Sequence, residues 1–576
     1  MIHHELAELF DNMADLLEFR NENPFRVRAY RRASAQLAQL SEDVRTLDAE
    51  NRLTEIPGIG QDLARKIHEY LATGTVVEIE RLKQQVPPSI FLLIQVPGIG
   101  PKTAAIIAER LKITSLAQLE AAAHDHQLCK LPGIQEVKEQ KILKGLALVR
   151  QGQHRRTLGA ALSLAQRLIE QLKALPDIRR IEIAGSLRRM KETIGDVDVL
   201  VSTAKPAAVM RQFTGGAWCR QVLASGPTKT SILTTDGMQV DLRAVKPEEF
   251  GAAWVYLTGS KDHNVRLRER AIRLGLKLNE YGLFRAASGR RVAGREEADV
   301  YKALGLDWIP PEIREDSGEL DAAADHTLPR LIEAKDIRGD FHVHTNQSDG
   351  SNTLQELADA ARRRGYEYLA ITDHSQSLKI AHGLSEAAMT AQLARIAEAN
   401  STLRGLTLLS GAEVDILKDG RMDYPDRILK QLDVVIGSVH SGFNQPEATI
   451  TNRILSAMRN RYVTFIAHPT GRLHGQREPY AVNLPAVFEG ARETQTALEI
   501  NASPTRLDLE ASAARQAVAA GARIVLSTDT HRLDHLDHMT LGLGLARRAW
   551  LEPKDVLNCL RRDELLAWIQ QKRNRP

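Results

Sequence analysis

The sequence predicts a multidomain protein with an α-helical N-terminal region, an α+β middle region and a C-terminal β/α barrel. Three observations lead to this prediction. A Pro-Gly turn repeats among short helical segments in residues 1–150, short β-type runs follow helices in residues 151–315, and apolar strands alternate with helices in residues 336–576. Residues 316–335 carry acidic and small side chains and are expected to form a polar linker. A chain of 576 residues is also too long for one hydrophobic core.

Charge and cysteine content restrict the class of protein. The formal net charge is only +4, but residues 151–315 carry about +8, whereas residues 1–150 and 316–576 are slightly acidic. The three cysteines form no C-x-x-C pair, which suits a reducing cytoplasm and offers neither a disulfide framework nor a Cys-based zinc site. The N-terminus lacks a signal-peptide pattern, and no apolar run reaches the length of a membrane span. We therefore expect a cytoplasmic protein without a membrane partner.

The N-terminal repeat predicts contacts to an anionic backbone. Its copies are Ile56-Pro-Gly-Ile-Gly60, Val96-Pro-Gly-Ile-Gly100 and a reduced third one, Leu131-Pro-Gly-Ile134. Such glycines can adopt positive φ and bring backbone N–H groups to the start of the next helix, where a phosphate binds well. The copies resemble the helix-hairpin-helix motif, which implies DNA-backbone contacts at Gly58, Gly60, Gly98 and Gly100. An ordinary glycine-rich helix turn is the alternative interpretation.

Three aspartates in the middle region predict a metal site. In Gly195-Asp-Val-Asp-Val-Leu200, strand alternation sends Asp196 and Asp198 to one face and the valines to the core. Asp241 occupies a second alternating run that can lie beside the first. Because like charges at close range oppose joint ionisation, three converging carboxylates indicate bound cations, and two Mg²⁺ ions would form a site for phosphoryl transfer.

The surrounding motifs resemble the nucleotidyltransferase superfamily and, more narrowly, the family X DNA polymerases. Besides the aspartates, these motifs are Ile183-Ala-Gly-Ser-Leu-Arg-Arg189 and Tyr256-Leu-Thr-Gly-Ser-Lys-Asp-His-Asn264, with Arg268 one helical turn later. The resemblance implies catalysis and binding of two Mg²⁺ or Mn²⁺ ions by the three aspartates, with Asp241 accepting the primer 3′-hydroxyl proton. It further implies triphosphate contacts from Ser186, Arg189 and Gly195, nucleotide contacts from Tyr256, Gly259 and Asn264, and a template contact from Arg268. Lys261 is expected to strengthen nucleotide binding as a local cation.

The same family often carries a 5′-deoxyribose-phosphate lyase in its N-terminal domain. Lys66 matches the Schiff-base lysine of that activity, and Tyr30 and Arg26 stand where the phosphate pocket begins. Two further basic positions of the pocket are Asp62 and Glu78 here, and these departures weaken phosphate capture. Lyase activity is therefore an open alternative, and the domain can instead be a DNA clamp only.

Histidines and carboxylates in the C-terminal region follow successive apolar strands. Because the carboxyl ends of parallel strands meet at one face of a β/α barrel, these side chains should converge. Imidazole and carboxylate donors together favour Zn²⁺, Mn²⁺ or Fe²⁺ over Mg²⁺ alone. The pattern resembles the PHP (polymerase and histidinol phosphatase) domain, in which nine ligands hold three metals, here expected to be Zn²⁺ or Mn²⁺. The matching positions are His342, His344, Asp349, His374, Glu413, His440, His468, Asp529 and His531.

Asp349 departs from the histidine that other members of that family often carry, but no ligand position is lost. We therefore expect an active phosphoesterase, with His382 and Arg472 as substrate contacts. The resemblances together imply a template-directed, gap-filling DNA polymerase with a 3′-5′ exonuclease, acting as a monomer on gapped or primed duplex DNA and dNTPs in base excision repair. An apurinic-site endonuclease or 3′-phosphatase remains open. The alternatives are a non-templated nucleotidyltransferase fused to a histidinol-phosphatase-like enzyme, and a DNA-end scaffold without catalysis.

Overall fold

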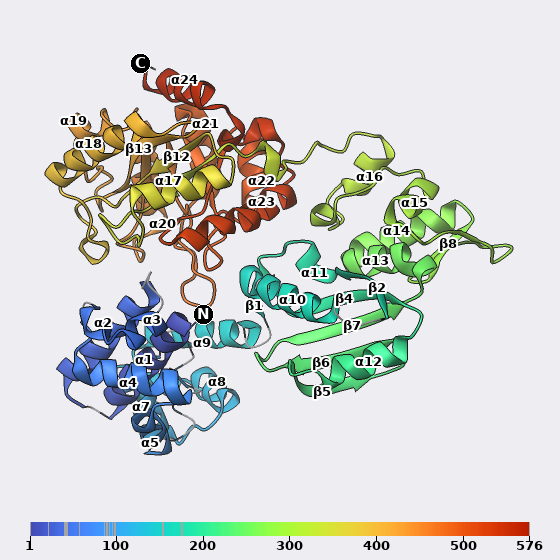
Figure 1. The fold of residues 1–576 in the computed structure, drawn as a ribbon, viewed down its shortest axis with the longest axis horizontal. Helices are drawn as coiled ribbons and strands as arrows, with labels where there is room; N and C mark the ends of the chain where they lie inside the picture. Colours follow the sequence, from blue (N-terminus) through green and yellow to red (C-terminus); the bar gives the residue numbers. More distant parts are fainter. Residues whose placement is uncertain are drawn as a thin grey trace. The chain divides into compact units, whose positions relative to one another are not determined.

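The computed structural model of the chain describes residues 2–20, 22–39, 44–56, 58–85, 87, 90, 93–94, 96, 99–152, 155–173 and 177–574. The chain divides into two compact units at residue 153 (Figure 1). The described helices include none that is long and apolar enough to cross a bilayer.

The first unit consists of helices joined by short turns. The helices α1 and α2 pack against each other, and the rings of Phe10 and Tyr30 meet edge-on at 5.5 Å between centroids. Gly60 and Gly100 are the N-cap residues of α4 and α7. The described α-helices of this unit are α1 (Ile2–Phe19), α2 (Pro24–Gln39), α3 (Val44–Ala49), α4 (Gln61–Thr73), α5 (Val77–Gln85), α7 (Pro101–Leu111), α8 (Leu116–His124) and α9 (Glu136–Gly152).

A five-stranded mixed sheet forms the centre of the middle region. Its strands run in the order β2 (Ile178–Ile183), β4 (Asp196–Thr203), β7 (Gln239–Val245), β6 (Lys229–Thr234) and β5 (Cys219–Ser225). The helices α10 (Leu158–Lys173) and α12 (Pro206–Gly215) pack against it. Val197 and Val199 are fully buried, as the alternating pattern predicts. The predicted α+β fold is confirmed.

A second subdomain follows the sheet. It contains α13 (Phe250–Thr258), α14 (Lys261–Arg273), the antiparallel strands β8 (Leu276–Asn279), β9 (Gly282–Arg285) and β10 (Arg291–Ala293), and α15 (Glu297–Ala303). Residues 316–335, expected to be a polar linker, contain α16 (Glu319–Ala324) and join this core. Glu319 is fully buried with its Oε1 atom 2.6 Å from Nδ1 of His263. Burial of an acidic residue is tolerated here because it is paired.

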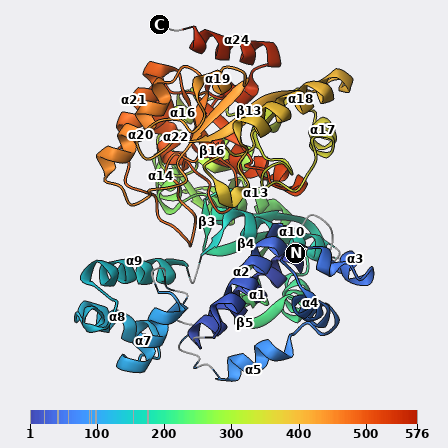
Figure 2. The same cartoon turned by 90° about the vertical axis from the view of Figure 1, so that its left-hand side faces the viewer.

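The C-terminal region is the predicted β/α barrel. Seven parallel strands stand in sequence order, and a bridge between Val343 and Thr530 nearly closes the sheet. Figure 2 shows α20 and α21 on one side of the strands and α17 and α18 on the other. The strands are β11 (Gly339–Val343), β12 (Tyr368–Ile371), β13 (Thr407–Asp415), β14 (Val434–Ser438), β15 (Phe465–Ile466), β16 (Ala497–Asn501) and β17 (Ile524–Ser527). The main outer helices are α17 (Leu354–Arg363), α18 (Glu386–Thr402), α20 (Glu447–Arg459), α21 (Leu484–Thr494), α22 (Ala511–Ala519), α23 (Met539–Arg548) and α24 (Arg562–Arg573).

Candidate active sites and DNA-binding hairpins

Three carboxylates meet on the sheet of the middle region. The strands β4 and β7 are parallel neighbours, and their register pairs Asp198 directly with Asp241. Asp196 lies two residues before Asp198 and therefore on the same face. One oxygen from each of the three side chains lies within 4.8 Å of the others. The structure thus brings together the aspartates expected to bind metal.

The three carboxylates differ in their electrostatic environment. Burial, followed by the charges of Asp196 and Asp241, raises the pKa of Asp198 to about 7. Burial alone would also raise the pKa of Asp241, but hydrogen bonds, chiefly from Gln239 and Lys229, lower it. Nζ of Lys229 is 3.0 Å from Oδ2 of Asp241. The negative charge of the three carboxylates is therefore not fully compensated around Asp198, and divalent cations bound there would compensate it.

Gly185 makes room for this arrangement. Its φ is +65°, and a Cβ atom built on it would lie only 2.1 Å from Oδ2 of Asp198. The backbone N–H of Ala184 also donates to the carbonyl oxygen of Asp198 at 2.8 Å. A residue without a side chain is required here because both the backbone conformation and the space exclude Cβ. Ser186, expected to contact triphosphate, is the next residue, and Gly195 directly precedes β4.

The residues expected to contact the nucleotide lie around the junction of α13 and α14. The side-chain nitrogen of Asn264 donates to the carbonyl oxygen of Tyr256 at 2.7 Å and to that of Gly259 at 3.3 Å. Tyr256, Asn264 and Arg268 line one small pocket, and a Cβ atom at Gly259 would lie 2.6 Å from Oδ1 of Asn264. Lys261 is exposed at the first position of α14. Tyr256, Gly259, Asn264 and Arg268 therefore lie together at this junction.

Arg189 differs from the expectation. It was predicted to hold triphosphate, but its Nε donates to Oε1 of Glu315 at 2.9 Å and its guanidinium to the carbonyl oxygen of Thr258 at 2.7 Å. Its neighbour Arg188 forms a two-pronged ion pair with Glu297. Both guanidinium groups are engaged by carboxylates from distant segments, Arg188 by the buried Glu297 and Arg189 by the half-buried Glu315. In this conformation Arg188 and Arg189 are held within the protein by these contacts.

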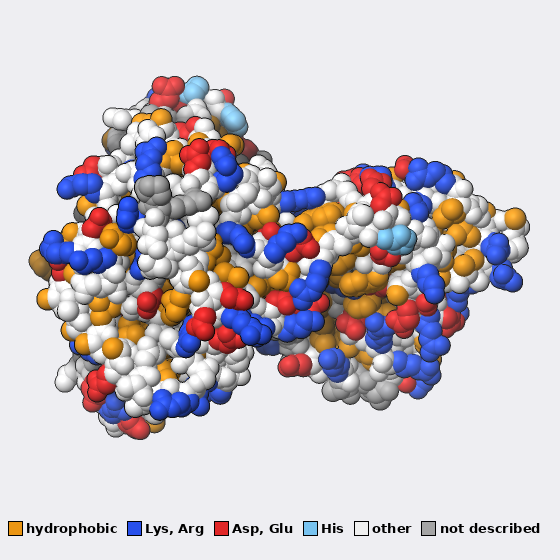
Figure 3. Space-filling model, turned by 90° about the horizontal axis from the view of Figure 1, so that it is seen from above, with side chains coloured by type: hydrophobic (Ala, Val, Ile, Leu, Met, Phe, Trp, Pro, Cys, Tyr) orange, Lys and Arg blue, Asp and Glu red, His pale blue; other side chains and the backbone are white. Residues whose placement is uncertain are grey.

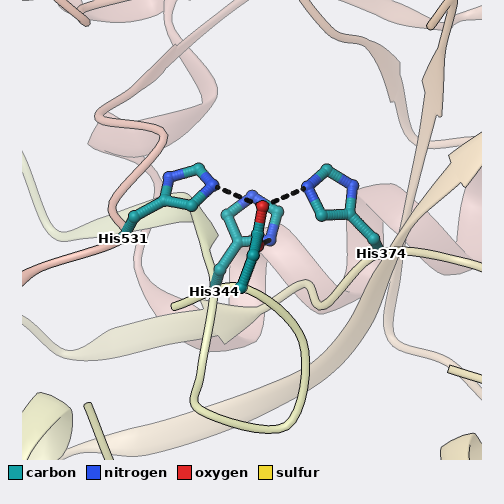
Figure 4. Close-up of side chains that lie close together, drawn as sticks. His344, His374 and His531 are labelled. Carbon is teal, nitrogen blue, oxygen red and sulfur yellow. Dashed lines mark ion pairs between the residues drawn. The ribbon is translucent and has the colours of Figure 1, made fainter. Parts of the chain in front are cut away.

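The nine residues matched to PHP ligands converge at one end of the barrel. Eight of them form three overlapping groups, each with donor atoms within 4.8 Å of one another, and the ninth, His468, contacts Glu413 of the third group. Figure 4 shows the rings of His344, His374 and His531 directed toward one point. Two of these rings, His374 and His531, each place Nε2 at 3.4 Å from Oδ2 of Asp349. The groups are His344, Asp349, His374 and His531; His342, His344 and Asp529; and His374, Glu413 and His440.

Glu413 lies at the centre of this cluster. Its Oε1 atom is 3.0 Å from Nε2 of His468 and 3.2 Å from Nε2 of His440. Its Oε2 atom is 2.9 Å from Nδ1 of His374 and 3.2 Å from Nε2 of His342. Burial opposes ionisation, yet the surrounding imidazoles hold the pKa of Glu413 well below its ordinary value. One carboxylate therefore lies within 3.2 Å of four histidines, and Nε2 of a fifth, His344, is 3.7 Å from its Oε2 atom.

The donor set fits metal ions. Nε2 of His342, both ring nitrogens of His344, Nδ1 of His374 and Nδ1 of His468 are buried and have no hydrogen bond of normal geometry among the described residues. Buried polar atoms in that state are costly unless another ligand satisfies them. Imidazole and carboxylate donors are those that Zn²⁺ and Mn²⁺ accept. The barrel residues therefore fit the bound metals that the sequence predicts.

Several functional residues were missed by the sequence analysis. Glu499 accepts from Nδ1 of His342 at 2.8 Å, and Asp415 lies 2.5 Å from Nδ1 of His440, which directs the opposite nitrogens inward. Arg506 places Nε 3.3 Å from Oδ2 of Asp529. In the sequence, Glu499 and Arg506 could have been noticed only through their position at or after β16. Arg472, expected to contact substrate, instead donates through Nε to the carbonyl oxygen of Arg506 at 2.9 Å.

The first two hairpins present the backbone geometry expected of phosphate sites. Gly60 and Gly100 have nearly identical conformations, with φ −85° and ψ 177° against φ −84° and ψ 170°, and neither meets an atom within 4 Å of a built Cβ. Gly58 has φ +85° and packs against Arg32. Gly98 lies outside the described residues. The open helix starts of α4 and α7 are therefore available to an anion.

The predicted lyase lysine is held by acidic residues. Nζ of Lys66 lies 3.0 Å from Oε2 of Glu78 and forms a second ion pair with Asp62. Burial would lower the pKa of Lys66, but these contacts and Tyr30 raise it. A Schiff-base lysine must reach the neutral form to attack, so this environment opposes that role. The two acidic departures noted in the sequence are thus the lysine's own partners.

Family models match the chain in four places: a helix-hairpin-helix domain at residues 1–76, a helix-hairpin-helix tandem at 90–147, a DNA polymerase beta thumb at 253–315 and a PHP domain at 340–499. With the sheet and its three aspartates, these matches define a DNA polymerase of the beta type joined to a metal-dependent phosphoesterase barrel. A Bacillus subtilis relative, described as a DNA polymerase/3′-5′ exonuclease PolX, is 37% identical over 98% of this chain and 99% of its own length. The chain belongs to the PolX family.

The barrel also has relatives of its own. A probable phosphatase of Caldanaerobacter subterraneus is 29% identical over 41% of this chain and 92% of its own length. A probable phosphatase of Syntrophotalea carbinolica is 28% identical over 38% of this chain and 90% of its own length. The C-terminal region therefore resembles phosphatases that consist almost entirely of this barrel.

Proposed function

We propose that the chain is a template-directed, gap-filling DNA polymerase that also trims 3′ ends through its barrel. The observation that carries the proposal is the presence of two separate ligand clusters on a chain that matches a PolX over 98% of its length. One cluster contains the three aspartates, and the other contains the histidines and carboxylates of the barrel, with His468 against Glu413. The polymerase would add dNTPs to a primer in gapped DNA and release pyrophosphate. DNA repair by a cytoplasmic monomer is the role that fits this activity.

At the polymerase site the protein supplies position and charge. Asp241 is held ionised by Lys229 and Gln239, so its carboxylate can accept the proton of the primer 3′-hydroxyl. Asp196 and Asp198 would hold Mg²⁺ or Mn²⁺ ions, which supply charge neutralisation for the triphosphate and activation of the hydroxyl. The junction around Tyr256, Gly259 and Asn264 would position the nucleotide, with Arg268 toward the template strand.

At the barrel site the protein orders its imidazoles. Glu499 and Asp415 fix one ring nitrogen of His342 and His440, so the other nitrogen keeps its lone pair toward the cluster. Arg506, beside Asp529, supplies a positive charge that can meet a phosphodiester. Zn²⁺ or Mn²⁺ is the cofactor that these donors favour. The reaction is hydrolysis of the terminal phosphodiester at a 3′ end.

DNA would be held by local contacts. On the face drawn in Figure 3, Lys and Arg side chains are interspersed with Asp and Glu. Oriented backbone amides at the starts of α4 and α7 do not depend on such side chains. We propose that these hairpins bind the DNA backbone without reading sequence, which agrees with the low net charge of residues 1–150.

The test is a one-nucleotide-gapped duplex with a 5′-phosphate, dNTPs and Mg²⁺ or Mn²⁺. Asp196→Asn should abolish extension and keep degradation, whereas His344→Ala should do the reverse. Matched controls are Asp236→Asn and His326→Asn, because both residues are exposed and Asn tolerates the positive φ of His326. Loss of both activities in either site variant would refute two independent sites.

A second candidate for the barrel is a 3′-phosphatase, because its barrel-only relatives are described as probable phosphatases. A primer ending in 3′-phosphate separates the two reactions. Release of inorganic phosphate without loss of nucleotides would indicate a phosphatase, whereas stepwise shortening of a 3′-hydroxyl primer would indicate an exonuclease. Both products must disappear in His344→Ala.

A further inference from the structure

A further cluster of metal-type donors belongs to the first unit and shares no residue with either active site. Among the described residues, His126, Cys129 and Glu139 bring an imidazole nitrogen, a thiol sulfur and a carboxylate oxygen within 4.8 Å of one another. They flank the third hairpin, Leu131-Pro-Gly-Ile134, with His126 and Cys129 before it and Glu139 in the first turn of α9.

The contacts fix all three donors on one side of the turn. Nδ1 of His126 lies 2.7 Å from Oε1 of Glu139, and the backbone N–H of Cys129 donates to Oε2 at 3.0 Å. The thiol of Cys129 donates to the carbonyl oxygen of His126 at 3.2 Å. All three residues come from a segment of 14 residues, so the donors are preassembled by local structure.

An ordinary structural role explains part of this arrangement. Oε2 of Glu139 caps the 3₁₀ turn Leu128–Lys130 through Cys129. It does not explain why the carboxylate, which is fully buried, faces an imidazole that is 58% exposed and a thiol. A buried carboxylate needs a cationic or hydrogen-bonding partner. A divalent ion between Oε1, Nδ1 and the sulfur would satisfy that need more completely than a half-solvated histidine.

We propose that His126, Cys129 and Glu139 bind a thiophilic divalent ion that stabilises the third hairpin, with Zn²⁺ as the best match. Zn²⁺ accepts sulfur, nitrogen and oxygen donors together, whereas Mg²⁺ does not bind thiols. The three protein donors leave a fourth position, which water can fill from the exposed side of His126. Binding releases the Cys129 thiol proton to solvent and moves the His126 ring proton from Nδ1 to Nε2, because a metal binds a thiolate and an unprotonated ring nitrogen.

Stabilisation of this hairpin has a specific reason. The third copy has Gln135 where the first two have Gly60 and Gly100, so it keeps only its first glycine, Gly133, whose φ of +77° matches the +85° of Gly58. An ion that joins the segment after α8 to the first turn of α9 would hold the hairpin by cross-linking the elements on both sides of it. The ion would also add positive charge to a region that precedes the polymerase sheet.

The test uses Co²⁺ as a spectroscopic substitute for Zn²⁺ in the full chain. Thiolate-to-Co²⁺ charge transfer absorbs in the near ultraviolet, and both active-site clusters consist of His, Asp and Glu without cysteine. We expect this band in the wild type, in Asp196→Asn and in His344→Ala, which keeps the result independent of the proposed enzymatic function. Cys129→Ser should lose the band and Cys219→Ser should keep it. Absence of the band in the wild type, or its persistence in Cys129→Ser, would overturn the proposal.

A second measurement needs no variant. Alkylation of Cys129 by iodoacetamide, followed by mass spectrometry of the peptide that contains it, should slow at least tenfold when Zn²⁺ is added. Cys219 serves as the internal reference, because no metal-type donor group among the described residues includes it. An unchanged alkylation rate at Cys129 in saturating Zn²⁺ would also overturn the proposal.

Discussion

Alanine at position 185 would test how closely the polymerase site depends on one missing side chain. The added methyl carbon would stand 2.1 Å from Oδ2 of Asp198 and 3.0 Å from its Cγ, whereas ordinary contact begins near 3.4 Å. The Asp198 carboxylate must therefore move by about 1 Å, and a displacement of that size at a reacting centre lowers rates by about 100-fold. The positive φ of +65° adds about 1–2 kcal/mol of backbone strain.

The assay is single-turnover gap filling, with degradation of a single-stranded 3′ end measured in parallel. Gly185→Ala should lose about two orders of magnitude in dNTP addition and keep the barrel activity. Gly215→Ala is the matched control, because a Cβ atom there meets nothing within 4 Å. Wild-type polymerisation by a folded Gly185→Ala protein would refute the argument that the Asp198 position is set by this glycine.

Three further outcomes are expected. In metal-free protein, the pKa of Asp198 is about 7 in the folded state and about 4 in the unfolded state. The folded state therefore binds one more proton between these values, and the free energy of unfolding of the wild type should fall as the pH rises from about 4 to about 7. Asp198→Asn lacks this proton, so its free energy of unfolding, measured by urea titration, should rise relative to the wild type across that pH range by no more than about 4 kcal/mol. The same dependence of the unfolding free energy on pH in both proteins would contradict the raised pKa of Asp198. Glu413→Gln should bind fewer barrel metals by mass spectrometry and lose degradation while gap filling persists; full metal content would contradict the central role of Glu413. Asp62→Asn should increase borohydride-trapped adduct at Lys66 by releasing its amine, and no adduct in either protein would leave that lysine structural.

The parts of the site that follow strand periodicity could be predicted from the sequence. Alternation placed Asp196 and Asp198 on one face, and the strand-end rule gathered histidines from segments almost 200 residues apart, such as His342 and His531. Both rules depend on where strands lie and end, and local patterns of apolar and polar residues in the sequence indicate those positions.

The parts that depend on distant partners could not be predicted. Arg189 was expected at the triphosphate, but Glu315, 126 residues later in the chain, holds its guanidinium. Residues 316–335 looked like a linker because their acidic side chains are visible in the sequence, whereas the pairing of Glu319 with His263 is not. The residue type does not show whether a charged side chain is exposed or paired, because tertiary packing alone decides whether it faces solvent or a buried partner.

The shared carboxylate of Glu413 has a consequence for how the barrel fills. Because it lies against His342, His374 and His440, which belong to different donor groups, an ion bound at one group changes the charge and orientation of a ligand used by the next. The affinities of the groups should therefore be coupled. A cation at one group withdraws negative charge from the shared carboxylate and repels a second cation, so partly filled barrels should accumulate when metal is limiting, and the measured activity of a preparation would depend on how many groups each molecule has filled.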